Sequence, residues 1–563
     1  MSYDLESVSL PRLGTGALRL LVALLENPAT RSPLIAKLKR DAGLTQLREM
    51  IVDEPPTLFP ALPSDDRPAL PGEPAVAASA REPPGFHFPG MVDYTGAYRA
   101  GRTTPVRVAE RFLDQSDLSE RDAPPLKAFI AVQRDDLMAQ ARASAERWRT
   151  GRPIGAFDGV PVAIKDEIDQ AGYPTTLGTA FLGGVPARAD ATVVARLRAA
   201  GALLVGKANM HEIGINVTGL NPHHGTTRNP YDDRFHTGGS SSGPATAVAS
   251  GLVPIAIGAD GGGSIRIPSA FCGIVGIKPT FGRISQFGAA PLCWSVAYIG
   301  PIAASVRDCA RTFALVSGAD SHDTHSLGHP DVESEDVAPA GNGDLAGVKL
   351  GVYWPWFRHA TRDVVERSER LVRALVDRGA TLREVDLPGL DEMRVAHLVI
   401  ITGEMTAAMS PQYGSHRRDF SLDARANLAI ARSFSASEYV TAQRVRTRAM
   451  ATFQRAFADV HAIVTPATGQ TAPRVNLSAQ PYGESNLSMT TEVMRFAFTA
   501  NLTGHPAISF PAGYDVNGLP VGLQVIGRAW SEHLLFRIAS VAESIVERRE
   551  PRRWYPSLDT ADA

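Results

Sequence analysis

The chain has 563 residues, of which 44% are hydrophobic and 21% charged, as is ordinary for a soluble globular protein. Its formal net charge is −2, so nothing in the composition favours nucleic acid or an anionic membrane surface as a partner. No apolar run approaches the roughly 20 residues of a membrane span, and no secretory signal is convincing.

The first 54 residues predict a small helical extension, with one amphipathic helix near 17–25 and a second near 33–51. Two short helices bury too little to be stable alone, so we expect them to dock on the main domain or on another subunit. Residues 55–87 are dense in proline and predict an extended linker. We expect the main domain over 88–555 and a flexible tail over 556–563.

Strand and helix patterns alternate in the main domain, which predicts an α/β layered fold. The expected strands are 160–164, 202–205, 254–258, 350–353 and 462–465, and the expected helices are 191–200, 242–251, 365–378 and 532–547. Residues 390–490 have the least regular pattern, and we expect loops that face a substrate there. The three cysteines, Cys272, Cys293 and Cys309, are too few for a disulfide framework and favour a reducing, cytoplasmic setting. The abundance of Ala, Arg, Gly and Pro suggests a bacterial source with a GC-rich genome.

Two glycine-flanked turns each carry serine: Gly238-Gly239-Ser240-Ser241-Ser242-Gly243 and Asp260-Gly261-Gly262-Gly263-Ser264. Glycine lets backbone N–H groups crowd around one point, as the stabilisation of an oxyanion requires. Neither turn carries a histidine that could act as the base for its serines. A serine without such a histidine needs another proton acceptor, and a desolvated lysine can serve. Lys165 ends the apolar run 160–164 and is the best candidate for that base.

Three other short patterns suggest different chemistry, and each fails on its context. The run 201–207 fits a phosphate loop, but Ala208 replaces the hydroxyl residue that would bind Mg²⁺. His211-Glu212 begins a zinc motif whose second histidine is replaced by Ile215. The run 239–243 fits a nucleophile elbow centred on Ser241, but no strand leads directly into it.

Several segments together resemble the amidase signature family of serine hydrolases over roughly residues 90–550. The segments are 165–166, 206–210, 227–230, 238–244, 258–280, 501–506 and 518–524. The resemblance implies an α/β/α sandwich around a twisted mixed sheet. It also implies that Ser264 is the nucleophile, that Ser240, entering on a cis peptide, is the bridging serine, and that Lys165 is the base.

The resemblance further places the oxyanion hole on the backbone N–H groups of Gly261, Gly262, Gly263 and Ser264. We expect Asp260 and Arg266 to form an ion pair that holds the nucleophile turn, with Ser241 in a supporting role. The segment Gly214, Ile215 and Asn216 is expected to contact substrate. Lys165 must be neutral to accept a proton, and burial favours the neutral form of a lysine.

The predicted activity is hydrolysis of a small-molecule carboxamide through an acyl-enzyme, with no metal and no cofactor. A carbamate or urea-type hydrolase and the glutaminase subunit of a tRNA-dependent amidotransferase are the alternative enzymes. An inactive binding scaffold is the alternative of another class. Similar N-terminal extensions pack at subunit interfaces, so we expect a homodimer, although a cap on the same chain fits the helices almost as well.

Overall fold

A single mixed sheet of eleven strands forms the centre of the protein in the computed structural model, which describes residues 3–63, 83–330, 332 and 344–559. Across the sheet the strands are β1 (Phe129–Ala131), β3 (Leu203–Ala208), β2 (Pro161–Lys165), β4 (Ile255–Ala259), β6 (Ile299–Ala303), β5 (Val275–Lys278), β10 (Ala507–Tyr514), β11 (Pro520–Gly527), β9 (Ala462–Pro466), β7 (Lys349–Val352) and β8 (Thr381–Glu384). β2 runs parallel to both β3 and β4, whereas the strands from β6 to β11 pair antiparallel.

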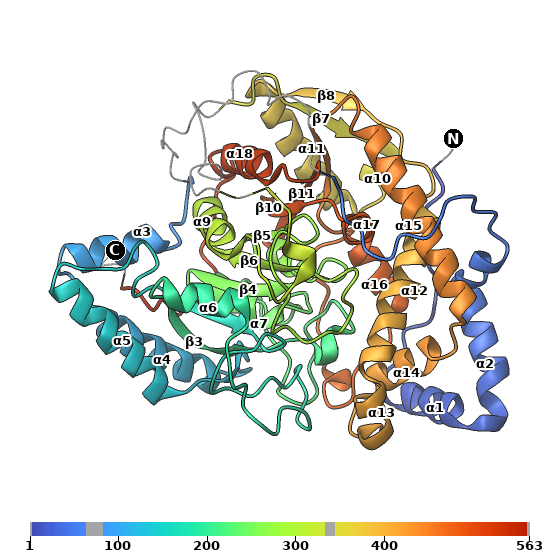
Figure 1. Ribbon diagram of the computed structural model, residues 1–563, viewed down its shortest axis with the longest axis horizontal. Helices are drawn as coiled ribbons and strands as arrows, with labels where there is room; N and C mark the ends of the chain where they lie inside the picture. The colour runs from blue at the N-terminus through green and yellow to red at the C-terminus, as the bar shows by residue number, and fades with distance from the viewer. Residues whose placement is uncertain (1–2, 64–82, 331, 333–343, 560–563) are drawn as a thin grey trace.

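Helices cover both faces of the sheet, as the predicted α/β/α sandwich requires (Figure 1). Successive residues of a strand point to opposite faces. In β2, Val162 and Ile164 accordingly pack with α6 (Thr192–Ala199), α9 (Val306–Val316), α11 (Arg362–Asp377) and α18 (Glu532–Glu543). Ala163 packs on the other face with α4 (Pro105–Arg121), α5 (Arg134–Arg149) and α7 (Ser242–Ala249).

Further helices complete the fold, and some of them are buried throughout. α3 (Met91–Arg99) lies near the C-terminal segment, where Tyr94 Oη and Ser557 Oγ are 2.7 Å apart (Figure 1). The others are α8 (Arg266–Phe271), α10 (Trp354–Phe357), α12 (Leu390–Ala408), α13 (Ser410–His416), α14 (Leu422–Ala431), α15 (Ala436–Ala456), α16 (Leu487–Met494) and α17 (Phe498–Thr503). Within the described ranges, no helix is both long and apolar enough to cross a membrane.

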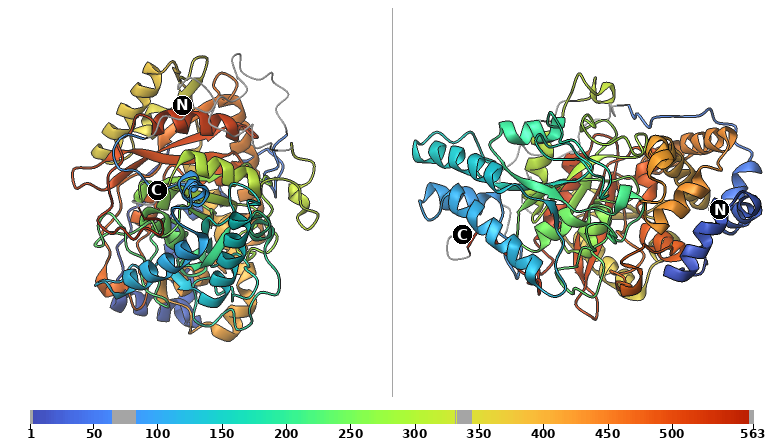
Figure 2. Two further views of the ribbon diagram at one scale, coloured as in Figure 1. Left: turned by 90° about the vertical axis from the view of Figure 1, so that its left-hand side faces the viewer. Right: turned by 90° about the horizontal axis from the view of Figure 1, so that it is seen from below.

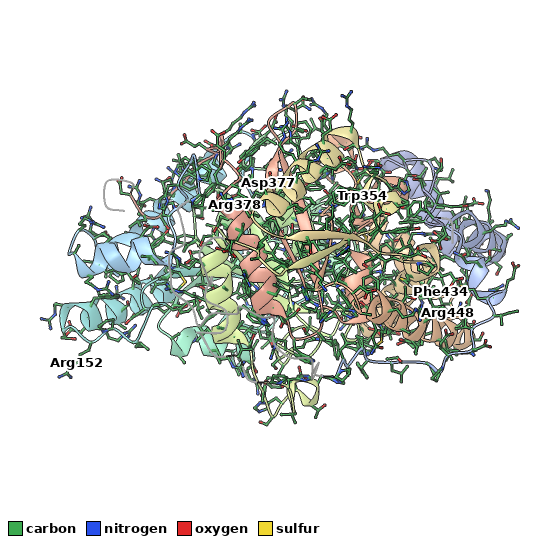
Figure 3. All side chains as sticks on the ribbon, turned by 90° about the horizontal axis from the view of Figure 1, so that it is seen from above. Arg152, Trp354, Asp377, Arg378, Phe434 and Arg448 are labelled. Carbon is green, nitrogen blue, oxygen red and sulfur yellow. The ribbon has the colours of Figure 1, made fainter. Side chains whose placement is uncertain are left out.

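The N-terminal helices α1 (Thr15–Glu26) and α2 (Pro28–Asp41) dock on the main domain of the same chain, at the end opposite α3 to α5 (Figure 2). Figure 3 shows the same two ends, with Arg152 at one and Phe434 and Arg448 beside the N-terminal segment at the other. A buried ion pair between Lys39 Nζ and Glu438 Oε1, 2.6 Å long, joins α2 to α15. The apolar contact is made by Leu18, Val22 and Leu25 of α1 against Leu422, Ala426 and Ala429 of α14.

Two sequence-based expectations need correction. The helix expected over 33–51 begins earlier, at Pro28 behind the capping side chain of Asn27, and ends at Asp41. Gly43 adopts a left-handed φ of +75°, which separates α2 from a 3₁₀ turn over Leu44–Arg48. The region 390–490, expected to be rich in loops, is mostly helical because it contains α12 to α15 and the first half of α16. Most of the linker, 64–82, and the end of the tail, 560–563, lie outside the described residues.

Candidate active site

The candidate site lies where two parallel strands end at one edge of the sheet. β2 and β4 are neighbours, with Ile164 paired to Ile257, so their carboxyl ends meet. β2 ends on Lys165, and β4 leads into the turn 260–264. In open α/β sheets this edge is where ligands bind. The topology therefore brings the predicted base and the predicted nucleophile turn together, although 99 residues separate Lys165 from Ser264 in the sequence.

Lys165 is buried, with 1% of its surface exposed, and its side-chain nitrogen points at the serine turn. Nζ donates a hydrogen bond to Ser240 Oγ at 2.8 Å and another to the carbonyl oxygen of Ala259 at 3.1 Å. The carboxylate of Glu167 lies 3.3 Å from the same nitrogen. Burial of Lys165 was predicted from the sequence, but the neighbouring carboxylate of Glu167 was not.

The two serine turns pack directly on each other. The peptide between Gly239 and Ser240 is cis, and the backbone N–H of Ser241 donates to the carbonyl oxygen of Ser264 at 3.2 Å. The Ser241 hydroxyl is fully buried and donates to the Ala259 carbonyl oxygen at 3.1 Å. Ser241 thus ties the serine turn to the end of β4, whereas Ser264 lines the neighbouring cavity.

A buried ion pair fixes the turn that carries Ser264. Arg266 Nε and Nη2 donate to the two carboxylate oxygens of Asp260, both at 3.0 Å, and neither side chain is exposed to solvent. Asn501 Nδ2 donates to Asp260 Oδ1, and Arg266 Nη1 donates to Gln524 Oε1. Burial opposes ionisation of Asp260, but the charge and hydrogen bonds of Arg266 outweigh it and lower the pKa of Asp260.

The predicted oxyanion hole is crowded, and one of its donors already has a partner. The N–H of Gly263 donates to Asp260 Oδ1 at 2.6 Å, so it is occupied in holding the turn. Gly262 lines the cavity, and a Cβ built there would lie 2.9 Å from His397 Cε1. Gly263 has a φ of +114°, a conformation that side-chain-bearing residues rarely adopt. Glycine at these positions is therefore a steric requirement.

His397 of α12 supports this loop from the opposite wall. The contact joins His397 Nε2 to the carbonyl oxygen of Gly261 at 2.8 Å, so Nε2 carries a proton and donates. Burial lowers the pKa of His397 to about 4, which keeps the ring neutral near pH 7. His397 was not predicted from the sequence, because it lies 136 residues from Gly261 on a helix that was not expected.

The cavity beside Ser264 encloses about 970 Å³, including the open space at its mouth. The predicted substrate contacts Gly214, Ile215 and Asn216 all line it. Most of the remaining wall is apolar, and it comes from α12, α16 and the start of α17: Leu398, Ile401, Met405, Leu487, Met494 and Phe498. The region 390–490 therefore does face this cavity, but with helices instead of loops.

A second apolar cavity of about 840 Å³, again including the open space at its mouth, adjoins the first and reaches the N-terminal segment. Both cavities share the wall residues Leu398, Thr402, Asn427, Ser485 and Leu487. The far wall consists of Leu10, Leu13, Leu21, Leu38 and Leu44, all of which come from the extension. The N-terminal helices thus contribute apolar side chains to a space that adjoins the Ser264 cavity.

The other lysines near the site have structural contacts. Lys207 Nζ donates to the Ile168 carbonyl oxygen at 2.6 Å, and Lys278 Nζ donates to that of Pro279 at 2.7 Å. Burial lowers the pKa of both lysines. Cys272, Cys293 and Cys309 are buried free thiols, and burial raises the pKa of each.

Hydrolytic enzymes use a serine hydroxyl that is hydrogen-bonded to a buried lysine, here at the carboxyl ends of parallel strands. The amidase family profile matches residues 107–536 of the chain. The chain therefore belongs to the amidase family, and its enzyme class is that of an amidohydrolase.

Individual relatives agree with this assignment. A fatty acid amide hydrolase of Oryza sativa subsp. indica is 39% identical, over 99% of this chain and 96% of the relative. The glutamyl-tRNA(Gln) amidotransferase of Symbiobacterium thermophilum has a subunit that is 34% identical, over 81% of this chain and 96% of the relative. The crystal structure of a peptide amidase from Stenotrophomonas maltophilia matches with a TM-score of 0.70 and 28% identity, covering 82% of this chain and 98% of that one.

Proposed function

We propose that this amidase hydrolyses amides of long apolar acids, with Ser264 as nucleophile, Ser240 as proton relay and Lys165 as base. The observation that carries the proposal is the apolar cavity that opens on Ser264 and adjoins a second apolar cavity. The relatives named fatty acid amide hydrolases, which align over nearly the whole chain, support the same substrate class.

The proton path starts at the Ser264 hydroxyl. As Ser264 Oγ bonds to the carbonyl carbon, its proton passes to Ser240 Oγ, and the proton of Ser240 passes to Lys165 Nζ, 2.8 Å away. The carbonyl oxygen becomes an oxyanion, for which we propose the N–H groups of Gly261 and Gly262 as the principal donors. When the C–N bond breaks, Ser240 returns a proton to the leaving nitrogen, and water then releases the acid from Ser264.

The acyl chain is proposed to occupy the cavity between Gly214–Asn216 and α12. Apolar contact there favours longer chains, because burial of each CH₂ group contributes about 0.8 kcal/mol. Leu398 and Leu487 line both cavities, so a long acyl chain that passes them would reach the leucines of the extension.

The test is a series of acyl p-nitroanilides from acetyl to decanoyl. kcat/KM should rise with chain length, by up to roughly fourfold for each CH₂ that is buried. Leu398→Trp should place a larger side chain where the two cavities adjoin. It should therefore lower decanoyl turnover far more than acetyl turnover. Leu477→Trp, at a side chain that is 69% exposed, is the matched control and should change neither. Equal kcat/KM for acetyl and decanoyl substrates would rule out the proposed substrate class.

The alternatives from the sequence are not favoured by the comparisons. The fatty acid amide hydrolases align with the N-terminal segment as well as the main domain, whereas the amidotransferase relative covers 81% of the chain. Carbamoyl transfer to Ser264 would use the same groups, so carbamates belong in the substrate panel as a comparison.

We also propose the domain limits expected from the sequence, with residues 1–54 as an extension that docks on the same chain and 88–555 as the catalytic domain. Docking in cis is supported by the buried Lys39–Glu438 pair and by the apolar contact of α1 with α14. The homodimer, the cytoplasmic setting and the bacterial source stay predictions.

A further inference from the structure

Glu167 is a carboxylate next to the proposed base, and the proposed proton path gives it no part. Its Oε2 lies 3.3 Å from Lys165 Nζ, and only 9% of its side-chain surface is exposed. Among the described residues, it supplies the only carboxylate within 4.0 Å of that nitrogen. The same oxygen lies 3.9 Å from the position that a Cβ on Gly214 would take, so Glu167 also borders the cavity wall.

Lys165 Nζ thus has three oxygen neighbours: Ser240 Oγ, the Ala259 carbonyl and Glu167 Oε2. The first lies on the proposed proton path, the second is a fixed dipole, and the third can carry a full charge. In a buried site a charge at this distance acts far more strongly than it would in water.

The other ionisable groups around this point have partners of their own. Asp260 is paired with Arg266, Glu404 accepts from Ser295 and Tyr439, and Asp169 accepts from Thr175. Lys207 is held by the Ile168 carbonyl and lies 3.9 Å from Asp166, which accepts from Thr176 and Gly178. The Cys293 thiol is kept protonated by burial, which raises its pKa.

We propose that Glu167 is a positioning residue for the amidase reaction, which holds Lys165 toward Ser240 and provides the counter-charge for the ammonium that forms during acylation. The inference rests on the proposed function, because it assumes that Lys165 receives the proton. Glu167 itself gains and loses no proton: Ser264 loses one, Ser240 exchanges one, Lys165 gains one, and the anionic carboxylate offsets the new positive charge. An aspartate has the corresponding part beside the histidine of serine proteases.

The carboxylate of Glu167 should also affect the protonation of Lys165 in the free enzyme, and this effect can be measured. A carboxylate next to Lys165 also favours the protonated lysine before substrate reacts, and a protonated lysine cannot act as base. Removing the charge should therefore let Lys165 lose its proton at lower pH. It should also lower the maximal rate, because the ammonium in the transition state loses its counter-charge.

The experiment is the pH profile of kcat/KM for decanoyl p-nitroanilide with wild-type enzyme and Glu167→Gln. The rising limb of Glu167→Gln should move to lower pH by about one unit, and its plateau should fall by roughly 10- to 100-fold. Glu167→Asp, which keeps the charge, should restore the position of the limb. Asp169→Asn removes a carboxylate two residues away that accepts from Thr175, and it should leave the profile unchanged.

A merely structural role would lower the plateau without moving the limb, so a Glu167→Gln profile with an unmoved limb would overturn the inference. Labelling by a fluorophosphonate in the same preparations separates this failure from failure of the proposed function. Label on Ser264 together with an unmoved limb rejects only the part given to Glu167. Label on a different serine rejects the proposed function and this inference with it.

Discussion

At the scale of single residues, the site depends on buried charges that hold each other in place. Arg266 contacts Asp260, Gln524 and Asn501 at once, and none of these four side chains is exposed. A network of this kind fixes one conformation of the nucleophile turn, because each group left without its partner would be a buried and unsatisfied charge or dipole.

Arg266→Ala should destabilise the protein by about 3–5 kcal/mol, because it leaves the Asp260 carboxylate buried without its counter-charge. Chemical denaturation measures the loss. Arg266→Lys keeps the charge but not the planar pair of donors, and it should recover only part of the stability. An alanine variant as stable as the wild type would show that the pair does not hold the turn.

Lys165→Ala should reduce amide hydrolysis by several orders of magnitude, since the proton of Ser264 then has no acceptor beyond Ser240. Activated esters should lose less activity, because their leaving groups need no protonation. Parallel assays of a p-nitroanilide and a p-nitrophenyl ester of the same acid compare the two losses. Equal losses on both substrates would count against protonation of the leaving group through Ser240.

At the scale of secondary structure, the chain's local patterns predicted the strands next to the site but not the wall opposite it. The strand expected over 160–164 is β2, and that over 254–258 is β4, each displaced by one residue. Short apolar runs bounded by glycine and proline are enough to define such buried strands. The helix expected over 532–547 ends at Glu543, so only its beginning was predicted well.

Helix α12 was missed because its apolar residues do not keep to one face. Val395, Ala396, His397 and Met405 are all buried although they point to different sides of the helix, since the helix is enclosed by the main domain, α14, α15 and the N-terminal segment. Without a polar stripe the helical period disappears from the sequence. His397 and the rest of the cavity wall on α12 therefore could not be predicted from the sequence. Glu167 could have been predicted as a neighbour of the base, because it stands two residues after Lys165.

The junction of α9 with the end of α18 contains two buried acids. Burial raises the pKa of Glu543 to about 7 and that of Asp308 to about 6, even though Arg548 lies 3.8 Å from Glu543. A carboxyl group whose pKa is raised on folding stabilises the folded state at low pH. That contribution is lost as the pH rises through the pKa of the folded state.

Glu543→Gln should therefore gain stability relative to the wild type as the pH rises from 5 to 8, by up to about 3 kcal/mol. A glutamine oxygen can still accept from the N–H of Val306, as Glu543 does. Thermal unfolding at both pH values measures the difference, with the exposed Glu110→Gln as control. A stability difference that does not depend on pH would contradict the assignment of Glu543 as a buried neutral acid.

At the scale of the whole molecule, the N-terminal extension is packed against the catalytic domain and still exposes one large apolar side chain on its outer side. Leu20 of α1 is 62% exposed, while Leu18, Val22 and Leu25 face α14. The sequence predicted that these helices would dock, but it left open whether on the same chain. The structure shows the docking in cis, so a dimer formed through the N-terminal helices would have to use their outer face.

Light scattering should give a mass near twice the 60.1 kDa of the chain if the predicted homodimer forms. Leu20→Glu should then reduce the mass to that of one chain, because it places a charge on the outer side of α1. Leu118→Glu, an exposed position on α4 at the opposite end, is the control and should stay dimeric. A wild-type mass near 60.1 kDa would rule out the dimer.

The central claim is that Ser264 attacks the amide carbonyl, and covalent labelling tests it most directly. A fluorophosphonate with a long alkyl chain should react with the full-length enzyme, and mass spectrometry of its peptides should find the adduct on Ser264. Ser264→Ala should lose both the label and the turnover of decanoyl p-nitroanilide while its unfolding temperature stays close to that of the wild type. An adduct on Ser241, or a Ser264→Ala variant that still turns over substrate, would contradict the account.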